Sequence, residues 1–365
     1  MYYLPKKANL ITSSNAESGK LDESCKSSNA SSSDRYRYEH KYELSDFEIY
    51  EIFHKRIYLD VIESKAFQRL KDIMFLGSID YVLDIKNNKS IKRHNRFQHS
   101  LGVARLALQF SEEKKLSERQ ENICVVAALL HDIGHAPLSH SLESVFKEHF
   151  GISHHDAGEQ IIKGDVKIGK GLHKILVKWD INPFEILSII DGKGGRPYND
   201  VFSHSINIDT IEGISRSYKY IKPDNDITYP VSVVLDALIN LTVDSKDVLD
   251  KFWDLKHEVY SRLINSRLGV LADFICQDYM RTHSSKFKKE YYFGDEDELI
   301  INHAALFDRL ICLGRGSKKL FSANLRISCF KRSFFIDENV GLDSLYSIDA
   351  RYKQKKEPYD YKIRI

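Results

Sequence analysis

Apolar residues at helical spacing are the feature that most constrains the fold of this chain. The clearest stripe consists of Phe97, Leu101, Ala104 and Leu108. Residues three or four apart share one face of a helix, so this stripe predicts a helix with one buried side. Only seven of the 365 residues are prolines, and hydrophobic residues make up 42% of the chain. Few prolines allow long helices, and we therefore expect a mainly α-helical body with a substantial core.

Helix start signals support this expectation at two places. Ser117 is followed three residues later by Gln120, and Ser153 by Asp156. Each pair fits a capping box, in which the two side chains satisfy free backbone N–H groups at the start of a helix. We expect helices to begin directly after Ser117 and Ser153.

The two ends of the chain differ from its middle. Residues 12–34 contain nine serines and few apolar groups, so we expect residues 1–34 to be a flexible tail. Near the other end, residues 325–329 alternate between apolar and polar, and the SFFID run that follows favours a strand. The basic segment 351–365 is expected to be a solvated tail, with contact to an anionic partner as the alternative.

Overall composition argues against an unselective nucleic-acid-binding protein, a disulfide-rich protein and a membrane protein. With 54 basic and 52 acidic side chains, the net charge of +2 gives no general reason for unselective binding to nucleic acid. The five cysteines are scattered, which is typical of reduced intracellular thiols and not of a disulfide framework. We find neither a signal peptide nor an apolar run long enough for a membrane span, and we expect a cytoplasmic protein.

Histidines and acids gather in three segments: 93–103, 129–143 and 207–214. In the second segment, His131 and Asp132 directly follow the apolar run AALL. An imidazole and a carboxylate at the buried end of a helix lose hydration unless they are paired or bind a cation. A divalent metal would compensate, and this donor set suits Mn, Mg, Fe, Ni or Zn. The spacing alone does not decide between a metal and a structural pair.

The sequence here resembles a known family. Its four blocks are FQRLKDIMFLG (67–77), NRFQHSLGV (95–103), HDIGHAPLSHSLE (131–143) and NIDTIEGI (207–214). They follow the H…HD…D pattern of the HD-domain phosphohydrolases, in the branch related to deoxynucleoside triphosphate triphosphohydrolases. The likeness extends over roughly residues 40–280 of the sequence, and it implies an HD-domain helical bundle.

The resemblance also implies a set of site residues. The metal ligands would be His99, His131, Asp132 and Asp209. A metal held this way polarises a phosphoryl group and activates water.

Four further residues take catalytic roles in this interpretation. Arg96 would hold phosphate, because its planar guanidinium suits contacts to paired oxygens. His154 would donate a proton to the leaving group, with His155 as the alternative one position away. His135 belongs to the same motif and would join the site, either at a second metal or against phosphate.

Two positions depart from the family pattern. Phe75 stands where the branch usually has Gln, and Thr210 stands where a Lys usually follows the last metal ligand. Both positions concern nucleotide recognition in that branch. The resemblance therefore supports the metal chemistry more strongly than the identity of the substrate.

We therefore expect a metal-dependent phosphohydrolase that acts on a nucleotide, with a deoxynucleoside triphosphate as one candidate substrate. The alternatives are a phosphodiesterase of cyclic or oligonucleotides, and a nucleotide sensor without turnover. The expected layout is the tail at 1–34, the HD domain at 35–285 and a small mixed α/β extension at 286–365. No organic cofactor is expected; a homo-oligomer and a nucleic-acid partner stay open.

Overall fold

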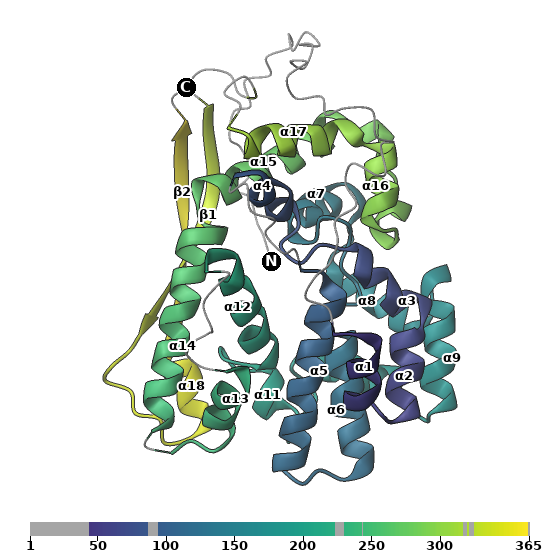
Figure 1. Ribbon diagram of the computed structural model, residues 1–365, viewed down its shortest axis with the longest axis vertical. Helices are drawn as coiled ribbons and strands as arrows, with labels where there is room; N and C mark the ends of the chain where they lie inside the picture. Colours follow the sequence, from purple (N-terminus) through teal and green to yellow (C-terminus); the bar gives the residue numbers. More distant parts are fainter. Residues whose placement is uncertain are drawn as a thin grey trace.

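The computed structural model describes residues 44–86, 94–222, 230–242, 244–316, 320 and 325–363. The predicted Ser-rich tail lies outside these residues. Helices dominate the described part, and one two-stranded antiparallel sheet lies near the C-terminus (Figure 1). The mainly α fold class is therefore confirmed. Within the described ranges, no helix combines the length and apolarity needed to cross a membrane.

The first half of the chain contributes α1 (Asp46–Ile52), α2 (Arg56–Glu63), α3 (Lys65–Gln68), the 3₁₀ helix η2 (Arg69–Asp72), α4 (Ser78–Lys86), α5 (Arg96–Glu113), α6 (Glu118–Leu130), α7 (His140–Phe150), α8 (His154–Lys163), α9 (Lys170–Lys178) and α10 (Pro183–Ile190). The second half contributes α11 (Asn199–Phe202), α12 (Ile208–Ile221), α13 (Val231–Ile239), α14 (Ser245–Val259), α15 (Arg267–Thr282), α16 (Glu296–Asn302), α17 (Ala304–Gly314), β1 (Leu325–Ile336), α18 (Leu345–Arg351) and β2 (Tyr352–Ile363).

Both predicted capping boxes are present. Ser117 accepts a hydrogen bond from the backbone N–H of Gln120 and caps α6. Ser153 does the same with Asp156 and caps α8. These contacts join residues three apart, so the local sequence is enough to specify them.

Two hydrophobic clusters form the core. The larger one joins α5 and α6 to the helices around them, including α12, α13 and α14. The smaller one joins α4 and α7 to α15, α16 and α17, which lie together in the upper part of Figure 1. This second cluster contains Phe146 and Leu271 together with Phe307 and Leu310, from both sides of residue 285. The domain limits remain a prediction.

The basic C-terminal segment is a strand, so the prediction of a solvated tail was wrong. Strand β2 pairs with β1 from Leu325↔Ile363 to Ile336↔Tyr352. Arg351, directly before β2, is 1% exposed and donates to both carboxylate oxygens of Asp250, at 2.8 and 2.6 Å. This ion pair between buried Arg351 and half-buried Asp250 fixes the start of β2 against α14. The strand partner and the anchor are distant in sequence, which is why local charge was misleading.

Candidate metal centre

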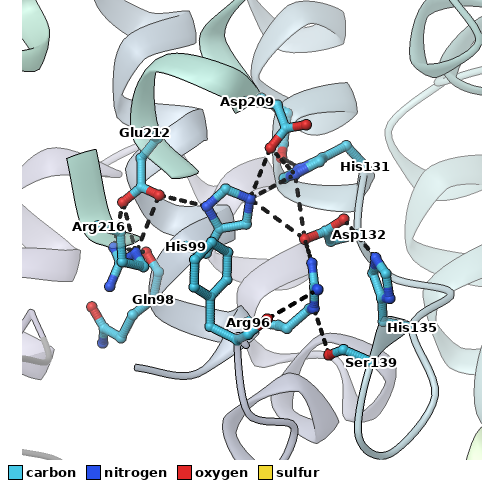
Figure 2. A network of polar contacts seen from close by, with 12 residues as sticks. Arg96, Gln98, His99, His131, Asp132, His135, Ser139, Asp209, Glu212 and Arg216 are labelled. Atoms are coloured by element: carbon cyan, nitrogen blue, oxygen red, sulfur yellow. Dashed lines mark hydrogen bonds and ion pairs between the residues drawn. The ribbon is translucent and has the colours of Figure 1, made fainter. Parts of the chain in front are cut away.

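Three helix ends bring the predicted metal ligands together. Asn95 caps α5 through the backbone N–H of Gln98, and His99 lies in the first turn of that helix. At the end of α6, His131 and Asp132 follow the last apolar residue. Asp209 lies in the first turn of α12, which Asn207 caps through the N–H of Thr210. Local capping thus sets where each helix begins, and packing places the three ends side by side (Figure 2).

Three of the four side chains, those of His99, His131 and Asp209, bring one donor atom each close together, and Asp132 lies beside the two imidazoles. His99 Nε2 lies 3.0 Å from Asp209 Oδ1 and 3.2 Å from His131 Nε2. Asp132 Oδ2 lies 3.5 and 3.6 Å from the same two imidazole nitrogens. Metal bonds of about 2.0–2.2 Å to nitrogen and oxygen put neighbouring ligand atoms roughly 3.0–3.5 Å apart. The donor atoms of His99, His131 and Asp209 are therefore spaced as ligands of one divalent metal would be, with Asp132 next to the two imidazoles.

Hydrogen bonds on the outer side of the imidazoles determine which nitrogen faces this point. His99 Nδ1 lies 2.5 Å from Glu212 Oε2, and His131 Nδ1 lies 2.8 Å from the carbonyl oxygen of Ala128. Both partners accept, so each Nδ1 carries the proton and each Nε2 lone pair points inward. Metal-binding histidines are commonly held in this way. The donor set and its orientation thus fit a metal ion.

Glu212 is a buried carboxylate that the sequence analysis did not assign. Arg216 donates from Nε to Glu212 Oε1 at 2.9 Å and orients the carboxylate. Burial raises the pKa of Glu212, but Arg216 and His99 outweigh this and lower it to about 2. Burial alone would lower the pKa of His99, but Glu212 and Asp209 raise it to about 9. The site therefore favours a positive charge at His99, and a bound metal would supply that charge in place of the proton.

The predicted phosphate ligand Arg96 is buried beside the cluster. Its Nη1 donates to Asp132 Oδ2 at 2.5 Å, its Nε to Ser139 Oγ at 2.9 Å, and its Nη2 to the carbonyl of Phe75 at 3.1 Å. A guanidinium has five N–H groups, so two remain beyond these three bonds. Arg96 thus orients Asp132 and has N–H groups left for a further anion.

A second histidine cluster adjoins the first. His135 Nε2 lies 3.2 Å from Asp132 Oδ1, and the His135 ring stacks on that of His154 at 4.5 Å. Glu143 bridges two histidines, because its carboxylate binds His154 Nδ1 and lies 2.9 Å from His140 Nδ1. Burial and the nearby Arg96 charge lower the pKa of His135 well below its usual range. His135, His140 and His154 are also close enough to hold a metal.

His154 and His155 are placed differently. His154 lies in the second cluster at the start of α8, whereas His155 is exposed, with its ring 4.1 Å from that of His154. Gly134 lies in the loop after α6 and explains how closely α8 approaches that loop. A Cβ at Gly134 would lie 2.0 Å from the carbonyl oxygen of His154, so a larger residue would displace this helix start.

Comparison with known proteins agrees with this geometry. A model of the HD domain family matches residues 96–175. Residues 96–175 are therefore similar to the HD domain family, and the similarity to the relatives below extends beyond this segment. The matched range begins at Arg96 and ends before Asp209. It covers His99, the His131–Asp132 pair, His154 and His155.

Several relatives carry the name deoxynucleoside triphosphate triphosphohydrolase SAMHD1, and two of them match this chain over more than half of its length. The homolog from Dictyostelium discoideum is 28% identical over 258 residues, which cover 63% of this chain and 47% of the relative. The human protein is 22% identical over 342 residues, which cover 81% of this chain and 49% of the relative. The chain thus spans less than half the length of these curated relatives.

A solved structure supports the fold alone. A hypothetical protein from Aquifex aeolicus superposes with a TM-score of 0.61 and 17% identity, over 85% of this chain and 93% of that one. A likeness at this identity shows a shared arrangement of helices and carries no function.

Phe75 lies beside two residues of the candidate metal site, His99 and Arg96. Its ring centroid is 4.7 Å from that of His99, and the Arg96 guanidinium lies 5.4 Å from the ring. The side chain therefore faces the site and does not turn away into the core. Its phenyl ring offers no hydrogen bond where the family branch usually has an amide.

Lys256 is a charged neighbour of the HD site that the sequence analysis missed. It is 9% exposed, and its Nζ lies 3.3 Å from the carbonyl of Ser205 and 4.4 Å from the Trp253 ring. Burial lowers its pKa to about 8, and the charge of Asp209 partly offsets that effect. A sequence signal did exist: Lys256 continues the buried stripe of Leu249, Trp253 and their neighbours on α14. A lysine on an apolar helix face is often functional or paired.

Proposed function

We propose that this chain is a metal-dependent phosphohydrolase that acts on a nucleotide, with His99, His131, Asp132 and Asp209 as the metal ligands. The observation that carries the proposal is the convergence of His99 Nε2, His131 Nε2 and Asp209 Oδ1 within 3.0–3.7 Å of one another. Asp132 Oδ2 lies 3.5 and 3.6 Å from the two imidazole nitrogens. Outer hydrogen bonds fix both imidazoles with Nε2 inward. A bound divalent metal would polarise a phosphoryl oxygen and lower the pKa of water.

Two cations beside the cluster fit an anionic substrate. Arg96 retains two N–H groups after its bonds to Asp132, Ser139 and Phe75. Lys256 interacts electrostatically with Asp209 from the α14 side. Phosphate oxygens carry negative charge that increases toward the end of a polyphosphate chain. We propose that Arg96 and Lys256 bind these oxygens and orient the scissile bond.

His154 is our proposed proton donor. Its Nδ1 is held by Glu143, which leaves Nε2 as the nitrogen that can protonate the leaving oxygen. The same carboxylate also lies 2.9 Å from His140 Nδ1, which helps to hold it in place against His154. His154 is the first residue of α8, so the start of that helix also positions its ring. His155 stays as the alternative, one residue away.

A deoxynucleoside triphosphate is the substrate that the relatives suggest. Both SAMHD1 relatives carry that activity in their names. Phe75 argues against carrying over the sugar preference of these relatives unchanged, because its ring cannot hydrogen-bond a sugar hydroxyl. We propose a nucleoside triphosphate as the substrate class, with sugar selectivity set differently from those relatives.

The deciding experiment is product analysis. The purified chain is incubated with Mn²⁺ or Mg²⁺ and a panel of paired ribo- and deoxyribonucleotides, and the products are separated by chromatography. Nucleoside plus tripolyphosphate would support the proposal. A linearised cyclic nucleotide would show the phosphodiesterase alternative, and metal-dependent binding without any product would show the sensor.

A further inference from the structure

Glu296 is a buried carboxylate far outside the HD match. It begins α16, is 3% exposed and lies more than a hundred residues beyond residue 175. Its Oε1 accepts two backbone hydrogen bonds, from Met74 N at 2.9 Å and Leu138 N at 3.0 Å. Its Oε2 binds the hydroxyl of Tyr81. One carboxylate therefore joins two loops that are 64 residues apart in the sequence, 74 to 138.

Both loops adopt unusual backbone conformations where Glu296 holds them. Leu138 and Ser139 have φ values of 59° and 47°. Residues other than glycine rarely adopt a positive φ of this size. On the facing loop, Gly77 has φ of 60°, and a Cβ there would lie 2.3 Å from the carbonyl oxygen of Leu138. Such backbone persists only where surrounding contacts enforce it. The bond from Leu138 N to Glu296 is one of these contacts.

The two loops lead directly to the metal centre. Ser139 Oγ donates to the carbonyl of Met74 at 2.8 Å and accepts from Arg96 Nε at 2.9 Å. Arg96 in turn donates to Asp132 at 2.5 Å (Figure 2). The contacts therefore run without a break from Glu296 through the paired loops to a proposed metal ligand.

We propose that Glu296 is a positioning residue for the metal centre, which it supports by holding the 74 and 138 loops together. The inference rests on the proposed metal site and deepens it. It makes α16, beyond the expected domain limit at 285, part of the support of the site.

The role requires hydrogen-bond acceptors and not a charge. Burial raises the pKa of Glu296 to about 7, so both protonation states are populated near neutral pH. Two residues of α4 act on the Glu296 carboxyl group: Tyr81 donates a hydrogen bond to it, and the charge of Asp80 raises its pKa. A neutral Glu296 still accepts both amides through its carbonyl oxygen, and its O–H can donate to Tyr81. An amide at this position offers the same pattern.

The test therefore compares Glu296→Gln with Glu296→Ala. We expect the Gln variant to keep metal affinity and kcat within about threefold. We expect the Ala variant to lose at least tenfold in one of them, as supporting residues around metal sites typically contribute about 10–100-fold. Metal affinity is measured by competition with a chelator on folded protein. Glu298→Ala is the matched control, because Glu298 is an exposed carboxylate on the same helix.

If Glu296→Ala does not fold, Ser139→Ala provides the test. This variant breaks the same contact path downstream, and Ser139 makes no side-chain cap on α7. It should lower metal affinity or kcat by about tenfold in protein that thermal unfolding shows to be folded. Normal metal affinity and kcat in folded Glu296→Ala or in Ser139→Ala would overturn the inference. A Gln variant as damaged as Ala would overturn it too.

Metal affinity also separates this inference from the proposed function. A wild type that binds metal but hydrolyses no nucleotide would refute the function, and the affinity comparison would still decide the role of Glu296.

Discussion

Replacing Glu212 by Gln tests whether a buried charge behind His99 sets the metal affinity of the site. The change keeps the shape of the side chain and one oxygen that can accept from His99 Nδ1, 2.5 Å away. It removes the negative charge, which contributes to raising the pKa of His99 to about 9. The amide also places an NH₂ group at the position of Oε1, so the two bonds that Arg216 donates to Oε1 are lost and the Nε bond to the other oxygen remains.

The size of the effect follows from the kind of hydrogen bond. A bond to a charged group contributes about 1.5–3 kcal/mol and a neutral bond about 0.5–1.5 kcal/mol. The difference of about 1–2 kcal/mol corresponds to roughly a 5- to 30-fold weaker metal complex. Losses of about 10–100-fold are typical when such supporting residues are changed. We therefore expect the dissociation constant for Mn²⁺ to rise by about tenfold or more.

The assay is a competition titration with a chelator, combined with thermal unfolding to show that the variant folds. Glu113→Gln is the matched control. It makes the same carboxylate-to-amide change at an exposed position on α5, 14 residues from His99. A folded Glu212→Gln protein whose Mn²⁺ affinity stays within twofold of wild type would refute the reasoning.

Three further predictions follow from the site. His154→Ala should lower kcat by about 100- to 10,000-fold at unchanged metal content, with His155→Ala milder; a loss below tenfold, seen in initial rates, would count against the proton-donor role. A proton competes with the metal at His99, whose pKa is raised to about 9, so metal affinity should rise about tenfold per pH unit from 7 to 9. Without metal, the stability from protonated His99 is fully present below its unfolded pKa of about 6.5 and should be lost as the pH rises through about 9, which thermal unfolding can follow. Lys256→Met should raise KM for a nucleoside triphosphate by about tenfold, with Lys256→Arg closer to wild type, because a bond to a charged group contributes about 1.5–3 kcal/mol.

The sequence by itself determined the features that depend on neighbouring residues. The capping boxes at Ser117 and Ser153 join residues three apart. The strand at 325–336 follows from the alternation of apolar and polar residues along a single segment. The predicted metal ligands rested on a motif, and three of their positions coincide with helix ends. In each case the information lies within one short stretch of chain.

Tertiary structure alone decided how these pieces are supported. Glu212 contacts His99 across 113 residues, and Glu296 contacts Met74 across 222. Strand β2 looked like a solvated basic tail because its partner strand and the Asp250 anchor lie elsewhere in the chain. A buried charge is stable only beside a partner, and a partner at such separation leaves no local pattern. Local hydrogen bonding therefore fixes where the donor atoms lie on each helix, whereas packing determines which charges surround them.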